Sequence, residues 1–144
     1  MDIESMVEQS KRLGVWAHLA TVSASGTPYV SPVHPCWEGS TLWTMLGVNS
    51  VKAKNIAQNP KVSYHWQVGP ETGFDSLMVW GTGEVFSDLE TKRRLWTGVF
   101  DYDLNEFAPG GPDDSPDTAF MALTVTKGVL LKTYGAAGRE DLEL

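Results

Sequence analysis

The order of the short β-prone segments constrains the fold of this chain more than any other sequence feature. Tight turns at 23–26 and 38–40 join the first three segments, and the order of strands and helices has no βαβ alternation. Gly81 and Gly83 interrupt the long fifth segment, as the bulge or sharp coil of a closing barrel requires. The pattern therefore predicts a mainly β, six-stranded antiparallel barrel, with strands at 16–22, 28–37, 41–46, 62–68, 76–86 and 118–134.

Helical patterns interrupt these strands and are expected to flank the barrel. The third of them begins with Ser87 and Glu90, which have the spacing of a capping box. Three helices are predicted, at 3–13, 50–58 and 87–100. The other long segments are predicted to be an acidic loop at 101–116 and a frayed tail from Gly135.

Length and charge limit the function classes. A chain of 144 residues is expected to form a single domain over 1–144, and its net charge of −7 argues against a nucleic-acid partner. No apolar run approaches the ~20 residues of a membrane span, and the N-terminus lacks the apolar centre of a signal peptide. With Cys36 as its single cysteine, the chain is expected to be cytoplasmic.

The segment from Trp43 to Lys61 carries the most informative chemistry. A strand delivers Trp43 and Thr44, and Ser50 then opens a helix with Lys52 in its first turn. Free N–H groups at a helix start, together with a hydroxyl and an ammonium group, can bind a phosphate. The same residues also suit an ordinary surface helix with a serine cap and solvated lysines.

Four segments in this order and spacing resemble the pyridoxamine 5'-phosphate oxidase-like flavin-binding split β-barrels, from about residue 13 to 134. The most specific is the pattern Lys-x-x-Asn-Ile-x-x-Asn-Pro-x-Val, which begins at Lys52 and ends at Val62. The matching segments are GTPYVSPV at 26–33, LWT at 42–44, SVKAKNIAQNPKV at 50–62 and MVWGTGEV at 78–85.

The resemblance implies a homodimeric split barrel that binds FMN between its subunits and acts on a small-molecule substrate. By analogy, Ser50, Val51 and Lys52 hold the cofactor phosphate. The remaining implied cofactor-binding residues are Ser31, Pro32, Val33, His34, Trp43, Thr44 and Ser76.

Departures from the family pattern redirect the expected activity. The vitamin-making oxidases carry an arginine and a lysine on the second strand, where this chain has Ser31 and Cys36. Their C-terminal segment that grips pyridoxal phosphate is expected to be missing here. We therefore expect a flavin-dependent oxidoreductase other than a true pyridoxamine phosphate oxidase. The alternatives are a coenzyme F420-dependent reductase and a non-catalytic flavin- or F420-binding protein.

The sequence singles out no catalytic residue and predicts no metal site. His18, His34 and His65 lie on different expected strands without metal-ligand spacing. Cys36 is interpreted as a small core residue. The acidic loop is expected to fold over the active site or across the dimer, with Tyr102 and Phe107 as its docking residues.

Overall fold

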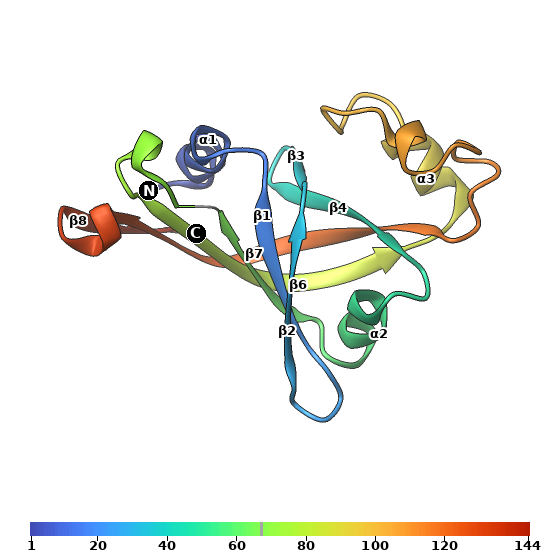
Figure 1. Ribbon diagram of the computed structural model, residues 1–144, viewed down its shortest axis with the longest axis horizontal. Coiled ribbons are helices and arrows are strands. Elements are labelled where there is room, and N and C mark those ends of the chain that lie inside the picture. The colour runs from blue at the N-terminus through green and yellow to red at the C-terminus, as the bar shows by residue number, and fades with distance from the viewer. Residues whose placement is uncertain (67) are drawn as a thin grey trace.

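The computed structural model describes residues 1–66 and 68–144, and in this part of the chain an eight-stranded antiparallel sheet forms the body of the protein (Figure 1). The hydrogen-bonded order is β2-β1-β5-β6-β7-β4-β3, and β8 also pairs with β7. The strands are β1 (Ala17–Val22), β2 (Pro28–Val33), β3 (Cys36–Glu38), β4 (Thr41–Gly47), β5 (Lys61–Trp66), β6 (Ser76–Phe86), β7 (Thr118–Lys132) and β8 (Gly138–Asp141).

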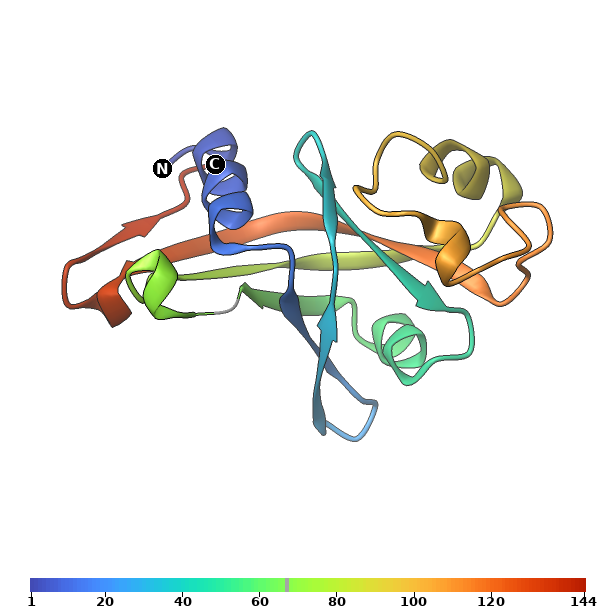
Figure 2. The same ribbon diagram turned by 45° about the horizontal axis from the view of Figure 1, so that its top comes forward.

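Two long strands, β6 and β7, form the axis of this sheet, and β1 and β2 cross them steeply (Figures 1 and 2). The pairing of β6 with β7 shifts register between Trp80 and Gly81, as expected for a bulge at this glycine. A Cβ atom at Gly81 would collide with the carbonyl oxygen of Thr124. Glycine at this position therefore allows the two backbones to approach closely.

The described part of the chain contains three α-helices: α1 (Ile3–Leu13), α2 (Val51–Gln58) and α3 (Leu89–Leu95). The first two agree with the predicted helices, and their N-caps are Asp2 and Ser50. Asn55 ties α2 to the sheet, because its buried side-chain amide donates to the hydroxyl of Thr21 on β1 at 3.1 Å. Short 3-10 turns occur at η1 (Pro70–Thr72), η2 (Leu104–Glu106) and η3 (Thr133–Gly135).

The predicted count of six strands was wrong. The expected strand 28–37 is divided into β2 and β3 by His34 and Pro35, because a proline cannot donate a ladder hydrogen bond. The tail expected to fray contains β8, which returns along β7 from Val129 to Lys132.

The third helix is also shorter than predicted and has a different cap. Asp88, rather than Ser87, caps α3 and accepts from the amide of Thr91 at 2.9 Å. The helix ends at Leu95, and Gly98 follows it with a φ of +92°, which is incompatible with helix continuation.

Among residues 1–66 and 68–144, two apolar clusters stabilise the fold. The larger lies between the sheet, α1 and α2, and includes Met6, Ile56 and Leu77. The smaller consists of Trp43, Leu95, Leu104 and Phe120, with Trp96, Val99, Phe100 and Tyr102 packed against it. This second cluster fixes α3 and the segment after it beside β4, at one end of the β6–β7 pair (Figure 2).

Candidate functional site

A cavity of about 280 Å³ opens where β2 ends, beside β4 and the start of α2. Apolar and aromatic side chains make up most of its wall, and Lys52 brings a cation to it. The lining residues are Trp16, Pro32, Val33, His34, Thr44, Met45, Leu46, Lys52, Tyr102 and Phe107.

The cavity brings together five of the residues that the sequence nominated for cofactor binding: Pro32, Val33, His34, Thr44 and Lys52. Tyr102 and Phe107 of the acidic loop also line it, as their expected docking role requires. Sequence reasoning missed Trp16, Met45 and Leu46. Their apolar character does not distinguish a cavity wall from the core.

The start of α2 offers unpaired backbone donors next to Lys52. The Ser50 hydroxyl donates to the carbonyl oxygen of Gly47 at 2.7 Å and accepts from the amide of Ala53 at 3.2 Å. The amides of Val51 and Lys52 have no backbone or side-chain acceptor among the described residues. Two N–H groups and one ammonium are thus available to an anion, whereas the Ser50 hydroxyl proton is already used.

Thr44 on β4 lines the cavity, but its hydroxyl is hydrogen-bonded within the core. The Thr44 and Tyr64 hydroxyls form a hydrogen bond of 2.5 Å, and Thr44 is only 2% exposed. Burial raises the pKa of Tyr64 well above its usual range, so the phenol stays protonated. The wall at Thr44 is therefore held rigidly from behind.

Trp43 is buried away from the cavity within this chain. Its indole N–H donates to Glu38 at 3.1 Å, and the guanidinium of Arg94 lies 5.7 Å from its ring centre. Arg94 also pairs with Glu38 at 2.5 Å. These contacts join β3, β4 and α3 behind the cavity.

The four other nominated residues, Ser31, Ser50, Val51 and Ser76, also lie outside the lining. Ser31 lies on β2 opposite Leu19, and Ser76 begins β6. The Ser76 hydroxyl is within 2.8 Å of His65 Nε2, and the His65 ring stacks against His18 at 6.4 Å. Burial and the neighbouring His18 lower the pKa of His65.

The cations at positions 92–94 each have a partner within the chain. Lys92 donates to the carbonyl oxygen of Ser115 at 2.6 Å, and Arg93 pairs with Asp113 at 2.7 Å. Together with the Arg94–Glu38 pair, these contacts engage all three cations, Lys92, Arg93 and Arg94. Lys52 has no ion pair within the described part of the chain.

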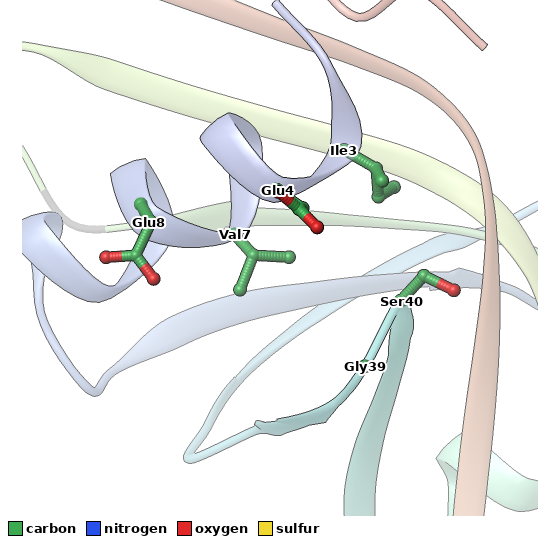
Figure 3. Close-up of a pocket in the computed structure, with 6 residues that line it drawn as sticks. All are labelled: Ile3, Glu4, Val7, Glu8, Gly39 and Ser40. Carbon is green, nitrogen blue, oxygen red and sulfur yellow. The ribbon is translucent and has the colours of Figure 1, made fainter.

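A second cavity, of about 410 Å³, lies between α1 and the turn that joins β3 to β4 (Figure 3). Ile3, Glu4, Val7 and Glu8 of α1 face Gly39 and Ser40 across it. Its ionisable groups are two carboxylates, which would repel a phosphate. The cavity at Lys52 is therefore the better candidate for an anionic cofactor.

The comparisons decide the family. The family model for pyridoxamine 5'-phosphate oxidase matches residues 15–132 of the chain. The chain belongs to this family. None of the curated proteins compared with the sequence matches it.

Solved structures of the pyridoxamine 5'-phosphate oxidase family have the same fold. A Clostridium acetobutylicum protein related to general stress protein 26 aligns with a TM-score of 0.78 and 19% identity, over 100% of this chain and 97% of that one. A family-related FMN-binding protein from Nostoc punctiforme aligns with a TM-score of 0.69 and 17% identity, over 96% of this chain and 86% of that one. An F420 reductase aligns with a TM-score of 0.63 and 27% identity, over 87% of this chain and 94% of that one.

Membership of the pyridoxamine 5'-phosphate oxidase family accounts for the mainly β antiparallel sheet and its flanking helices. The matched region contains every residue lining the Lys52 cavity. Among the described residues, no helix combines the length and apolar character of a membrane span.

Proposed function

We propose that this chain is a single-domain flavin-binding oxidoreductase that holds FMN at the interface of a homodimer. The observation that carries the proposal is the start of α2, where Lys52 lines an apolar cavity and the amides of Val51 and Lys52 have no acceptor among the described residues. The FMN-binding relative from Nostoc punctiforme supports the choice of cofactor.

The residues present suit such a cofactor. The Lys52 ammonium and the amides of Val51 and Lys52 would hold the phosphate, with the positive end of the α2 dipole behind them. Pro32, Val33 and His34 would flank the ring. When bound, FMN supplies the electron transfer, and the protein positions it and excludes water.

A second copy of the chain would complete the site. The cavity of about 280 Å³ lies just below the range of ~300–1,000 Å³ typical of ligand pockets. Large apolar side chains stay exposed nearby, including Trp16 at 52% and Phe107 at 65%. Val30 on the edge strand β2 is 67% exposed. Sedimentation analysis should give a particle of twice the monomer mass.

The substrate is expected to differ from pyridoxamine phosphate. By the resemblance, the vitamin-making oxidases use an arginine and a lysine on the flavin phosphate and ring where this chain has the uncharged Ser31 and Cys36, and Cys36 is buried against Asp101. The acceptor would instead be a small molecule that enters past Trp16 and the acidic loop.

Coenzyme F420 is the second candidate, because an F420 reductase is 27% identical over 87% of the chain. Titration of the purified protein with FMN and with F420, followed by absorbance and tryptophan fluorescence, separates the two. A nicotinamide donor then distinguishes turnover from simple binding, because only an enzyme bleaches and reoxidises its flavin.

The Lys52→Ala variant tests the phosphate site. Charge-assisted hydrogen bonds contribute ~1.5–3 kcal/mol, so the FMN dissociation constant should rise about tenfold or more. Lys61→Ala, at an exposed lysine of β5, is the matched control and should bind FMN normally. Equal affinities of the two variants would contradict the assignment. A wild-type protein that bound neither cofactor would contradict the function itself.

A further inference from the structure

Three side chains of different chemistry converge beside the Lys52 cavity. His34 Nε2 lies 2.7 Å from Asp101 Oδ1, and Cys36 Sγ lies 3.4 Å from the same oxygen. All three potential ligand atoms lie within 4.8 Å of one another. A nitrogen, a sulfur and an oxygen donor therefore surround one point in the structure.

The fold fixes each of these donors. Cys36 begins β3 and is buried, and His34 lies just before it, after β2. The His34 ring packs against two aromatic rings: its centre lies 5.2 Å from that of Trp16 and 4.4 Å from that of Tyr102. Asp101 lies between Phe100 and Tyr102, which both pack against the second apolar cluster.

The close contact between His34 and Asp101 is not an ordinary hydrogen bond. Nε2 is buried and, among the described residues, has no partner with hydrogen-bond geometry, although an oxygen lies 2.7 Å away. A buried polar nitrogen without a partner costs about 1–3 kcal/mol. A cation placed among the three donors would satisfy the nitrogen, the carboxylate and the sulfur together.

We propose that His34, Cys36 and Asp101 bind a divalent transition-metal ion of the zinc type. Zinc takes His, Cys and carboxylate ligands at ~2.0–2.3 Å in tetrahedral geometry. Such ligands lie roughly 3.3–3.7 Å apart, which the sulfur–oxygen separation of 3.4 Å already matches. The His34–Asp101 contact would need to widen by less than about 1 Å, and the separation of His34 from Cys36, at most 4.8 Å, would need to shorten by no more than about 1.5 Å. Calcium and magnesium prefer all-oxygen sites and fit this donor set poorly.

The ion would connect the acidic loop to β3 at the rim of the cofactor cavity. Three protein ligands leave one tetrahedral position, which water or an anionic group of a bound molecule would take. As the metal–sulfur bond forms, the Cys36 thiol proton leaves to solvent. The ligand His34 and the adjacent Tyr102 both line the cavity, so metal binding would shape the entrance used by the substrate.

Cobalt(II) titration of the purified chain tests this site directly. Cobalt replaces zinc in tetrahedral sites, and a bound thiolate gives it an intense near-ultraviolet charge-transfer band. We expect one cobalt per chain with this band, and displacement of the cobalt by zinc. Cys36→Ser should abolish the band. His34→Ala and Asp101→Asn should each weaken zinc binding at least about tenfold, since even outer-shell partners of a metal are worth ~10–100-fold.

Two control variants separate loss of ligands from loss of fold. Asp113→Asn changes a carboxylate of the same loop that pairs with Arg93, and His18→Gln changes a histidine outside the cluster. Both should bind zinc like the wild type, and the circular dichroism of every variant should stay native. Absence of the thiolate band in the folded wild-type protein would overturn the proposal, as would unchanged zinc affinity in Cys36→Ser. Neither result depends on whether the chain binds FMN.

Discussion

Lys92 and Ser115 are joined by a buried hydrogen bond of 2.6 Å from the lysine ammonium to the serine carbonyl oxygen. Lys92 is 5% exposed, although the two residues that follow it, Arg93 and Arg94, lie at the surface. The bond connects α3 to the end of the acidic loop. It therefore anchors the C-terminal end of the loop that carries Asp101 and Tyr102 to α3.

Replacing Lys92 with methionine should destabilise the protein. The substitution removes a charge-assisted hydrogen bond to the buried Ser115 carbonyl oxygen, which then accepts only from the amide of Thr118 at 3.1 Å; such bonds contribute about 1.5–3 kcal/mol. Urea denaturation followed by tryptophan fluorescence gives the free energy of unfolding. Arg93→Ala, which breaks an exposed pair, serves as the control and should cost no more than about 1 kcal/mol. Equal losses in the two variants would contradict the anchoring role of Lys92.

A methyl group at position 81 should disturb the centre of the sheet. In Gly81→Ala the new Cβ meets the Thr124 carbonyl oxygen, and such overpacking costs typically ~1–3 kcal/mol. Gly47→Ala is the matched control, because its Cβ would have no neighbour closer than 3.7 Å. Thermal unfolding should show a lower Tm for the first variant only.

Removal of the Tyr64 hydroxyl should reveal its coupling to Thr44. Tyr64→Phe leaves the Thr44 hydroxyl, which is 2% exposed, without this partner, at a cost of about 1–3 kcal/mol. Thr44→Val together with Tyr64→Phe should cost less than the sum of the single changes. A double-mutant cycle from urea denaturation measures the difference. Strict additivity would show that the hydrogen bond contributes nothing.

His65 should make stability fall in mild acid. Its pKa in the folded protein lies below the ordinary value of 6.5, chiefly because burial disfavours the charged ring and then because of His18. The unfolded chain therefore binds more protons, and stability present above pH 6.5 is lost as the pH falls through the folded pKa. The His65→Gln variant should show a weaker fall. Tm measurements across this pH range provide the check, and parallel curves would refute the assignment.

Local sequence signals predicted the fold where a single segment determines the structure. Ser50 and Asp2 cap helices within their own turns, so 3–13 and 50–58 could be read from spacing alone. The division of the strand at Pro35 and the pairing of β8 with β7 depend on neighbouring strands. A local pattern therefore predicts neither the number of strands nor the partner of β8. Ser87 and Asp88 are both good caps, and only the backbone geometry chose between them.

The candidate site was only partly accessible from sequence for the same reason. Lys52 belongs to a recognisable pattern, and it lines the cavity together with Pro32–His34. Asp101 lies 65 residues from Cys36, and only packing of the acidic loop brings their side chains together. The cofactor-binding roles implied for all the nominated residues stay predictions. Five of these residues lie outside the cavity of one chain: Ser31, Trp43, Ser50, Val51 and Ser76.

The position of β7 in the sheet also dictates an order of assembly. Its first half pairs with β4 and its far end with β8, while β6 covers its other edge. During synthesis, β4 has only the three residue pairs with β3 until residues 118–124 emerge. The apolar residues of β4, which include Leu42, Trp43 and Leu46, are therefore not paired with β7 until more than 70 further residues have been synthesised. On the ribosome, this half of the sheet completes late and is the part exposed to aggregation.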